Sequence, residues 1–282
     1  MTPLPHGIPN VARPTPGLDV EQLRDADRPL VRITRDTLLF IAGFSAVFVA
    51  LGLSATEAFR PHLRQALRTA LVRRLADLGI PADVGQIVTT VGATHGLDIV
   101  SRTLLQPGDA VLVDEPGWAV EFARLTRLGM RLLPVPRGPD GPDLVVMEAL
   151  LKAHRPRLYV TVSVLHNPTG CSLPPAAAHR VLRLAEEFDL TIVEDDTYAY
   201  LAPPHATRLA QLDGLRRTVH VSGFSKILTP QWRVGFIAAP PALAERFIDS
   251  KLLSTLTTAA PLEQALAWCL EQGALRRHAE RV

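Results

Sequence analysis

The segment SGFSKILTPQWRVGF, residues 222–236, joins two short apolar runs and decides which fold the sequence favours. The runs at 219–222 and 234–238 contain β-branched residues in a pattern that predicts two strands. Only 11 residues, from Gly223 to Arg233, separate these runs. That length is short for the helical crossover that joins parallel strands. We therefore expect one strand of the sheet to run antiparallel.

Further apolar runs precede this segment, and they alternate with helical patterns. Five more strands are predicted at residues 86–90, 110–113, 131–135, 158–163 and 190–194. Helices are predicted at residues 94–105, 118–128, 144–154, 174–188, 241–253 and 262–278. Such alternation is typical of a mostly parallel sheet that is covered on both faces. We predict an α/β fold, a three-layer sandwich around a seven-stranded, mostly parallel sheet with one antiparallel strand.

The N-terminal part, residues 1–58, has a different pattern. Proline and charge without a period predict an irregular arm over residues 1–30. Residues 37–55 form a run of 19 residues without charge, close to the length of a membrane-spanning helix. A membrane span and a buried segment both remain open, and the glycines and serines of the run favour burial. An amphipathic helix is expected over residues 59–78, at the start of a large domain that covers 59–282.

The composition excludes several classes of protein. Thirty Lys and Arg against 28 Asp and Glu give a net charge of +2, so a nucleic-acid partner is not expected. The two cysteines, Cys171 and Cys269, form neither a disulfide framework nor a metal motif. No apolar run follows a basic start, as it would in a signal peptide. We expect a cytoplasmic protein without a metal site.

Ligands of open α/β sheets bind beyond the carboxyl ends of the strands, so the residues at those ends are candidates for a binding site. Gly92, Ala93 and Thr94 lie between a predicted strand and a helix, where free backbone N–H groups suit a phosphate. Arg233 would add a guanidinium group to that phosphate. The hydroxyls of Ser222 and Ser225 lie in the same loop. The pattern predicts a phosphate site.

The other strand ends carry groups that suit an aromatic ring and an aldehyde. Asp195 follows an apolar strand, and a carboxylate there requires a cationic partner such as a protonated ring nitrogen. Lys226 lies where its amine could be made nucleophilic. An aromatic ring for stacking, an amide and a phenol are supplied by Trp118, Asn167 and Tyr198, respectively. Together these groups describe a pocket for pyridoxal phosphate.

The sequence resembles the class I/II aminotransferases, which are fold-type I pyridoxal-phosphate enzymes. Three motifs carry the resemblance: HNPTG at 166–170, EDDTYAYL at 194–201 and SGFSKILTPQWRVGF at 222–236. Their order and spacing match across roughly residues 60–282. The resemblance implies the large domain of a pyridoxal-phosphate-dependent transferase, with an amino acid and a 2-oxo acid as substrates and a homodimer as the assembly.

The resemblance also implies a role for each site residue. Lys226 is similar to the Schiff-base lysine, and Asp195 to the partner of the ring nitrogen. Tyr198 and Asn167 resemble the pair that binds the ring hydroxyl oxygen, and Trp118 resembles the stacking aromatic. The implied catalytic residues are Lys226, Asp195 and Tyr198. The phosphate ligands that the resemblance implies are Ala93, Thr94, Ser225 and Arg233, and the loop positions of Gly92 and Ser222 add these two residues to the predicted cofactor site.

The chain departs from the family pattern at both ends. Family members continue into a small C-terminal domain with an arginine for the substrate carboxylate, and this chain stops at Val282. Residues 51–56 lack the tyrosine that relatives place there, and no tyrosine precedes Tyr159. Two functions therefore compete. The first is an aminotransferase, and the second is a non-catalytic or truncated cofactor-binding module, such as the sensor domain of a transcriptional regulator.

Overall fold

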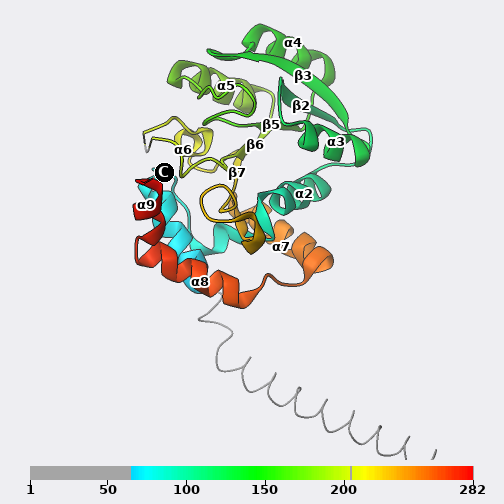
Figure 1. Ribbon diagram of the computed structural model, residues 1–282. Helices are drawn as coiled ribbons and strands as arrows, with labels where there is room; N and C mark the ends of the chain where they lie inside the picture. Colours follow the sequence, from blue (N-terminus) through cyan, green and yellow to red (C-terminus); the bar gives the residue numbers. More distant parts are fainter. Residues whose placement is uncertain (1–64, 204, 282) are drawn as a thin grey trace, which may run out of the picture. The chain divides into compact units, whose positions relative to one another are not determined.

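The computed structural model describes residues 65–203 and 205–281, and these form an eight-stranded sheet between helices (Figure 1). The strand order is β1-β8-β7-β6-β5-β2-β3-β4. The strands are β1 (Ile87–Thr90), β2 (Ala110–Glu115), β3 (Arg131–Gly138), β4 (Gly141–Pro142), β5 (Leu158–Thr161), β6 (Thr191–Asp195), β7 (Thr218–Gly223) and β8 (Gly235–Ala238).

The predicted antiparallel strand is β8. It runs antiparallel to both of its neighbours: Ala238 of β8 lies opposite Ile87 of β1, and Phe236 of β8 lies opposite Ser222 of β7. The strands β7, β6, β5, β2 and β3 are parallel to one another. The short segment between β7 and β8 therefore reverses the chain, as its length predicts.

The predicted count of seven strands is wrong by one. The extra strand, β4, has two residues and pairs antiparallel with the end of β3, where Arg137 is opposite Pro142. Gly141 has a φ of 97°, a left-handed conformation that glycine adopts readily. A two-residue strand is too short for an alternating pattern, so the apolar runs could not reveal it.

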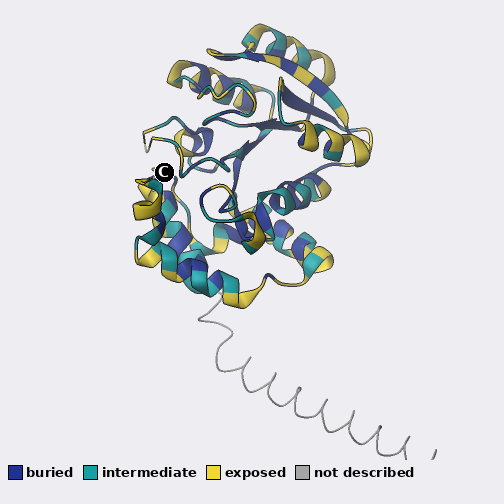
Figure 2. Ribbon diagram, viewed as in Figure 1, coloured by how far each residue is buried: buried dark blue, intermediate teal, exposed yellow. Residues whose placement is uncertain are grey.

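Helices cover both faces of the sheet, which confirms the three-layer fold. They are α2 (Gly92–Leu104), α3 (Ala119–Arg127), α4 (Leu144–His154), α5 (Pro175–Glu187), α6 (Leu209–Asp213), α7 (Pro241–Thr255), α8 (Ala260–Glu271) and α9 (Ala274–Ala279). Single turns of 3-10 helix lie at Val84–Gln86 and Pro230–Trp232. One core cluster packs side chains of α2, α3 and α7 on the sheet, and another packs those of α4 and α5. Figure 2 shows the central strands buried, the outer strand β3 alternately buried and exposed, and the outer helix faces exposed.

A third core cluster joins the first described helix, over residues 65–77, to α8 and the neighbouring strands. Leu67, Leu71 and Leu75 are fully buried in it, which agrees with the leucine spacing of the predicted amphipathic helix. The single helix predicted over 262–278 is wrong. It divides into α8 and α9 at Gly273, whose φ of 64° interrupts the helix.

The N-terminal predictions lie outside the described residues. These are the irregular arm and apolar segment of residues 1–58, including the uncharged run at 37–55. In the part of the chain that the structure describes, no helix is long and apolar enough to cross a membrane.

Candidate functional site

The start of α2 packs closely against the chain at both ends of the β7–β8 segment. A Cβ atom on Gly235 would lie 2.5 Å from the carbonyl carbon of Gly92, and one on Gly223 would lie 3.3 Å from the Ala93 nitrogen. Glycine at these positions therefore allows the first turn of α2 to approach the sheet. The close approach brings the N–H groups of the predicted phosphate site beside the segment that carries Lys226.

Arg233 joins this turn, as the sequence predicts. Its Nη2 atom donates a hydrogen bond to the carbonyl oxygen of Val91 at 3.2 Å. A Cβ atom on Gly92, whose φ is 77°, would lie 2.7 Å from the same Nη2 atom. Arg233 itself is exposed, and Ala93 and Thr94 are partly exposed. A guanidinium group and a helix N-terminus thus share one small region, which suits an anion.

Lys226 lies beside Tyr198. Its Nζ atom is 5.8 Å from the centre of the Tyr198 ring, and the lysine is exposed while the tyrosine is partly exposed. Ser225, the preceding residue, is partly exposed as well. Ser222 differs, because it is buried and its hydroxyl donates to the carbonyl oxygen of Asp196 at 2.8 Å. A phosphate role for Ser222 remains a prediction.

Trp118, Asn167 and Asp195 line one pocket, although they come from three separate strand ends. Trp118 is the N-cap of α3, Asn167 follows β5 and Asp195 ends β6. Asp114, Glu121 and His166 line the same pocket. The pocket therefore combines an aromatic ring, an amide and carboxylates at the sheet edge where ligands of open α/β folds bind.

The acidity of Asp195 is strongly altered in this pocket. Its Oδ1 atom accepts hydrogen bonds from the backbone N–H and the hydroxyl of Thr197. Burial raises the pKa of Asp195 to about 6, the bonds from Thr197 oppose the shift, and the charges of Glu121 and Asp196 add to it. A nearby cation would favour the ionised form, so the site suits a protonated ring nitrogen.

This raised pKa predicts a pH-dependent stability. Above pH 6 the folded chain holds an ionised Asp195 that burial disfavours, and this cost disappears as the pH falls towards the pKa of an unfolded aspartate, about 3.9. Asp195→Asn keeps an oxygen for Thr197 without the charge. We expect it to raise the free energy of unfolding of the cofactor-free protein by about 1–2 kcal/mol at pH 7.5 and to change it little at pH 4. Urea unfolding measures both, and equal effects at the two pH values would contradict the assignment.

A buried polar cluster around Asp114, which includes the neighbour of Asn167 in the chain, was not predicted from the sequence. Asp114 accepts hydrogen bonds from Arg137 at 2.8 Å, from Thr161 at 2.6 Å and from the Tyr159 hydroxyl. His166 lies 3.6 Å from Asp114, and its pKa falls to about 4 because of burial and the charge of Arg137. The cluster fixes the strand ends and keeps a neutral histidine before Asn167. In the sequence, this cluster is indicated only by polar residues within strands that are otherwise apolar.

A second buried cluster supports the end of β6. Arg208 donates to Asp196 at 2.7 Å, and both side chains are almost completely buried. Glu194 accepts hydrogen bonds from the first N–H groups of α6, at 2.6 Å from Leu209 and 3.0 Å from Ala210. His220 lies 3.4 Å from Glu194. Because Glu194 and Asp196 flank Asp195, their contacts set the position of the backbone that carries it.

The sheet order and the pocket at its strand ends define an α/β protein of the aminotransferase type. The model of the family described as "Aminotransferase class I and II" matches residues 50–280. The chain belongs to this family, as the sequence motifs indicate.

The relatives include both enzymes and regulators. The chain is 31% identical over 239 residues to the 2-aminoadipate transaminase of Thermus thermophilus, covering 83% of this chain and 57% of the relative. It is also 31% identical to YdcR of Escherichia coli, which is named as an HTH-type transcriptional regulator, covering 77% of this chain and 47% of the relative. The chain therefore spans about half the length of these relatives.

Solved structures share the fold. The α-aminoadipate aminotransferase LysN of Thermus thermophilus, in complex with N-(5'-phosphopyridoxyl)-L-leucine, gives a TM-score of 0.71 at 28% identity. This match covers 77% of the present chain and 56% of LysN. A kynurenine aminotransferase from Pyrococcus horikoshii gives a TM-score of 0.72 at 26% identity, covering 84% of this chain and 61% of that one.

The cofactor of this family is pyridoxal 5'-phosphate, and the described residues supply chemical groups that match it. The glycine at position 92 allows the guanidinium group of Arg233 to lie against the first turn of α2, where this group and the backbone N–H groups suit a phosphate. Asp195 offers a carboxylate for a cationic ring nitrogen, and Lys226 offers an amine for an aldehyde. In the described residues no group of His, Cys, Asp and Glu is arranged to hold a metal ion.

Proposed function

We propose that this chain is the cofactor-binding large domain of a pyridoxal-phosphate-dependent aminotransferase, which moves an amino group between an amino acid and a 2-oxo acid. The observation that carries the proposal is the pocket lined by Trp118, Asn167 and Asp195, together with an exposed Lys226 amine beside Tyr198. The family and its aminotransferase members support it.

Each side chain has a defined task in this proposal. When bound, pyridoxal phosphate supplies an aldehyde for condensation with amines and a ring that takes up an electron pair from the substrate Cα. Lys226 would hold the aldehyde carbon through Nζ, and once a substrate amine has taken its place there, the released lysine amine would move the proton at the substrate Cα. The carboxylate of Asp195 accepts a hydrogen bond from the ring nitrogen and keeps it protonated.

The remaining site residues bind and orient the cofactor. The N–H groups of Gly92, Ala93 and Thr94, with Arg233 and the Ser225 hydroxyl, bind the phosphate. The phenol of Tyr198 and the amide of Asn167 bind the ring hydroxyl oxygen. Trp118 packs on one face of the ring, where its flat side excludes water. The single proton of the Ser222 hydroxyl is donated to the carbonyl oxygen of Asp196, so Ser222 would have to release this bond before it could donate to the phosphate.

A cofactor-binding module without catalysis is the second candidate. Several relatives are named as HTH-type transcriptional regulators, among them YdcR of Escherichia coli and YcxD of Bacillus subtilis. In that case the pocket would act as a sensor domain, or as an inactive remnant, with the same cofactor ligands. The substrate carboxylate would then have no productive binding site.

One experiment separates the two candidates. Purified protein loaded with pyridoxal phosphate is mixed with a panel of amino acids, and its absorbance spectrum is followed by stopped flow. An aminotransferase converts the cofactor to its pyridoxamine form and returns it when a 2-oxo acid is added. A spectrum that no amino acid changes favours the module, and a protein that binds no cofactor contradicts both.

The proposed assembly is a cytoplasmic homodimer. Three leucines near the end of α7 have exposed side chains, Leu252 at 48%, Leu253 at 92% and Leu256 at 73%. Neighbouring exposed apolar side chains mark surfaces that contact another chain, and this supports a second copy as the partner. Sedimentation velocity of the cofactor-loaded protein distinguishes a dimer from a monomer.

A further inference from the structure

Glu121 is an unexpected carboxylate in the pocket that Asp195 lines. It lies in the first turn of α3, three residues after Trp118, and is only 5% exposed. Its side chain lines the same pocket as Trp118 and Asp195. A carboxylate in such surroundings requires a cationic partner, and here that partner is Arg124.

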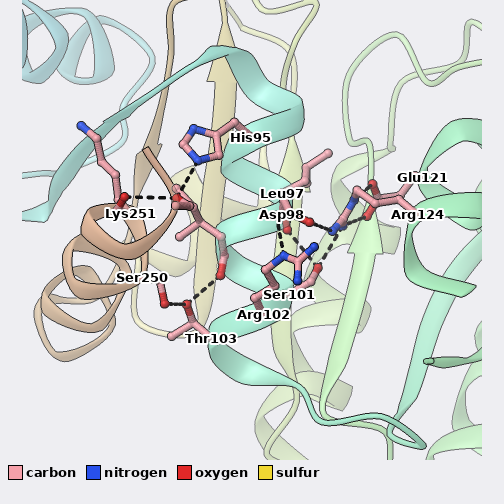
Figure 3. Close-up of polar contacts among 12 residues, drawn as sticks. His95, Leu97, Asp98, Ser101, Arg102, Thr103, Glu121, Arg124, Ser250 and Lys251 are labelled. Atoms are coloured by element: carbon pink, nitrogen blue, oxygen red, sulfur yellow. Dashed lines mark hydrogen bonds and ion pairs between the residues drawn. The ribbon is translucent and has the colours of Figure 1, made fainter. Parts of the chain in front are cut away.

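Arg124 holds Glu121 through two parallel contacts and also reaches α2. Its Nη2 and Nε atoms lie 2.5 Å and 2.9 Å from the two carboxylate oxygens of Glu121. The same guanidinium group donates to Ser101 at 2.9 Å and lies 3.5 Å from Asp98. Figure 3 shows Arg124 between Glu121 and these two side chains of α2. A bidentate arginine fixes direction as well as distance.

The two helices joined in this way carry different walls of the proposed cofactor site. The N-cap of α3 is Trp118, the proposed stacking residue. The first turn of α2 holds Gly92, Ala93 and Thr94, the proposed phosphate site. A change in the contact between α2 and α3 would therefore change the distance between Trp118 and the proposed phosphate site.

We propose that Glu121 and Arg124 are positioning residues of the cofactor pocket. Arg124 holds α3 against α2. It also holds the Glu121 carboxylate in the pocket, so that the negative charges of Glu121 and Asp195 act at the same place. The inference rests on the proposed function, since it takes the pocket as the place where the pyridine ring binds. Negative charge at this place favours a protonated ring nitrogen.

The charged groups that face Asp195 come from several elements. Glu121 faces it from α3, and Asp196 follows it in the chain; both charges raise the pKa of Asp195. Asp114, at the end of β2, lines the same pocket and is paired with Arg137, but its charge is not among those that raise the pKa of Asp195. His166 lines it from the segment after β5 and is held neutral by burial. Glu121 is therefore the acid whose removal tests the proposal.

The first test measures the carboxyl group of Asp195 directly. A ¹³C NMR titration of the cofactor-free full chain, with the signal assigned through Asp195→Asn, gives its midpoint. We expect E121Q, which keeps the shape of the side chain and removes its charge, to lower this midpoint by about half a pH unit or more. An unchanged midpoint would overturn the electrostatic part of the proposal.

The second test measures the locking of α3 to α2. R124K keeps the positive charge and loses the two parallel contacts, so we expect several-fold weaker binding of pyridoxal phosphate. The matched control is R102A, because Arg102 pairs with the same Asp98 at 2.7 Å but is 59% exposed. R102A is expected to bind the cofactor as the unmodified chain does.

Equal affinities of R124K and R102A would overturn the positioning role. If E121Q does not fold, the comparison of R124K with R102A still decides the proposal. Failure of the unmodified chain to bind pyridoxal phosphate would instead contradict the proposed function. The titration of Asp195 needs no cofactor, so its result remains separate from that outcome.

Discussion

Lys226→Ala is expected to abolish the visible absorbance band that pyridoxal phosphate acquires when it condenses with a lysine amine. The same change is expected to lower the rate of amino-group transfer by roughly 10³-fold or more, because one side chain both holds the cofactor and moves the proton. Absorbance of the loaded protein and single-turnover kinetics with an amino acid measure the two effects.

The surroundings of Lys226 make this variant a clean test. The side chain is exposed, so its removal leaves no buried cavity, and we expect the fold to remain intact. Lys152 supplies the control, since it is 61% exposed and pairs with Glu148 on α4, away from the pocket residues. Lys152→Ala should leave the band unchanged. A band that persists in Lys226→Ala would reject the proposed role of the lysine.

Arg208→Met is expected to cause the largest loss of stability, about 3–5 kcal/mol in the free energy of unfolding. The change removes the partner of Asp196 and leaves a carboxylate that is only 1% exposed. Burial already raises the pKa of Asp196, and the charges of His220 and Arg208 oppose that shift. Without the arginine, Asp196 must take up a proton or the region around it must open. Urea unfolding at pH 7.5 measures the change.

Two further variants identify the cause. Asp196→Asn combined with Arg208→Met removes the unpaired charge, so the double variant should be less destabilised than Arg208→Met alone. Arg217→Ala breaks an exposed pair, in which Asp189 is 93% exposed, and should cost no more than about 1 kcal/mol. Equal losses of unfolding free energy in all three variants would show that the buried ion pair of Arg208 contributes no more to stability than the exposed pair of Arg217.

The strands could be predicted because their signal is local. Each long strand is an apolar run, and the short spacing between residues 222 and 234 was enough to predict that one strand runs antiparallel, which the structure shows to be β8. The residues beyond the strand ends could be predicted as site candidates because parallel strands bring their carboxyl ends to one edge. Trp118, Asn167 and Asp195, which share a pocket, are examples. Their roles towards the cofactor remain predictions.

The missed features depend on contacts between distant residues. The sequence shows a glutamate at 121 and an arginine at 124, three residues apart on a predicted helix, but this spacing is equally typical of a solvated helix face. Burial of the pair follows from the packing of α3 beside α2 and the sheet, which no local pattern encodes. The short elements β4 and α6 were missed for a similar reason, because two and five residues carry too little periodicity.

The pairing of β1 with β8 has a consequence for the way the protein is made. β1 is synthesised first among the described strands, yet its only neighbour in the sheet is the last strand, β8. The first turn of α2, which follows β1, can therefore contact Gly235 and Arg233 only after almost the whole sheet has been synthesised. A nascent or truncated chain that ends before β8 would lack a complete anion site, and capture of phosphate there would report that β8 has joined the sheet.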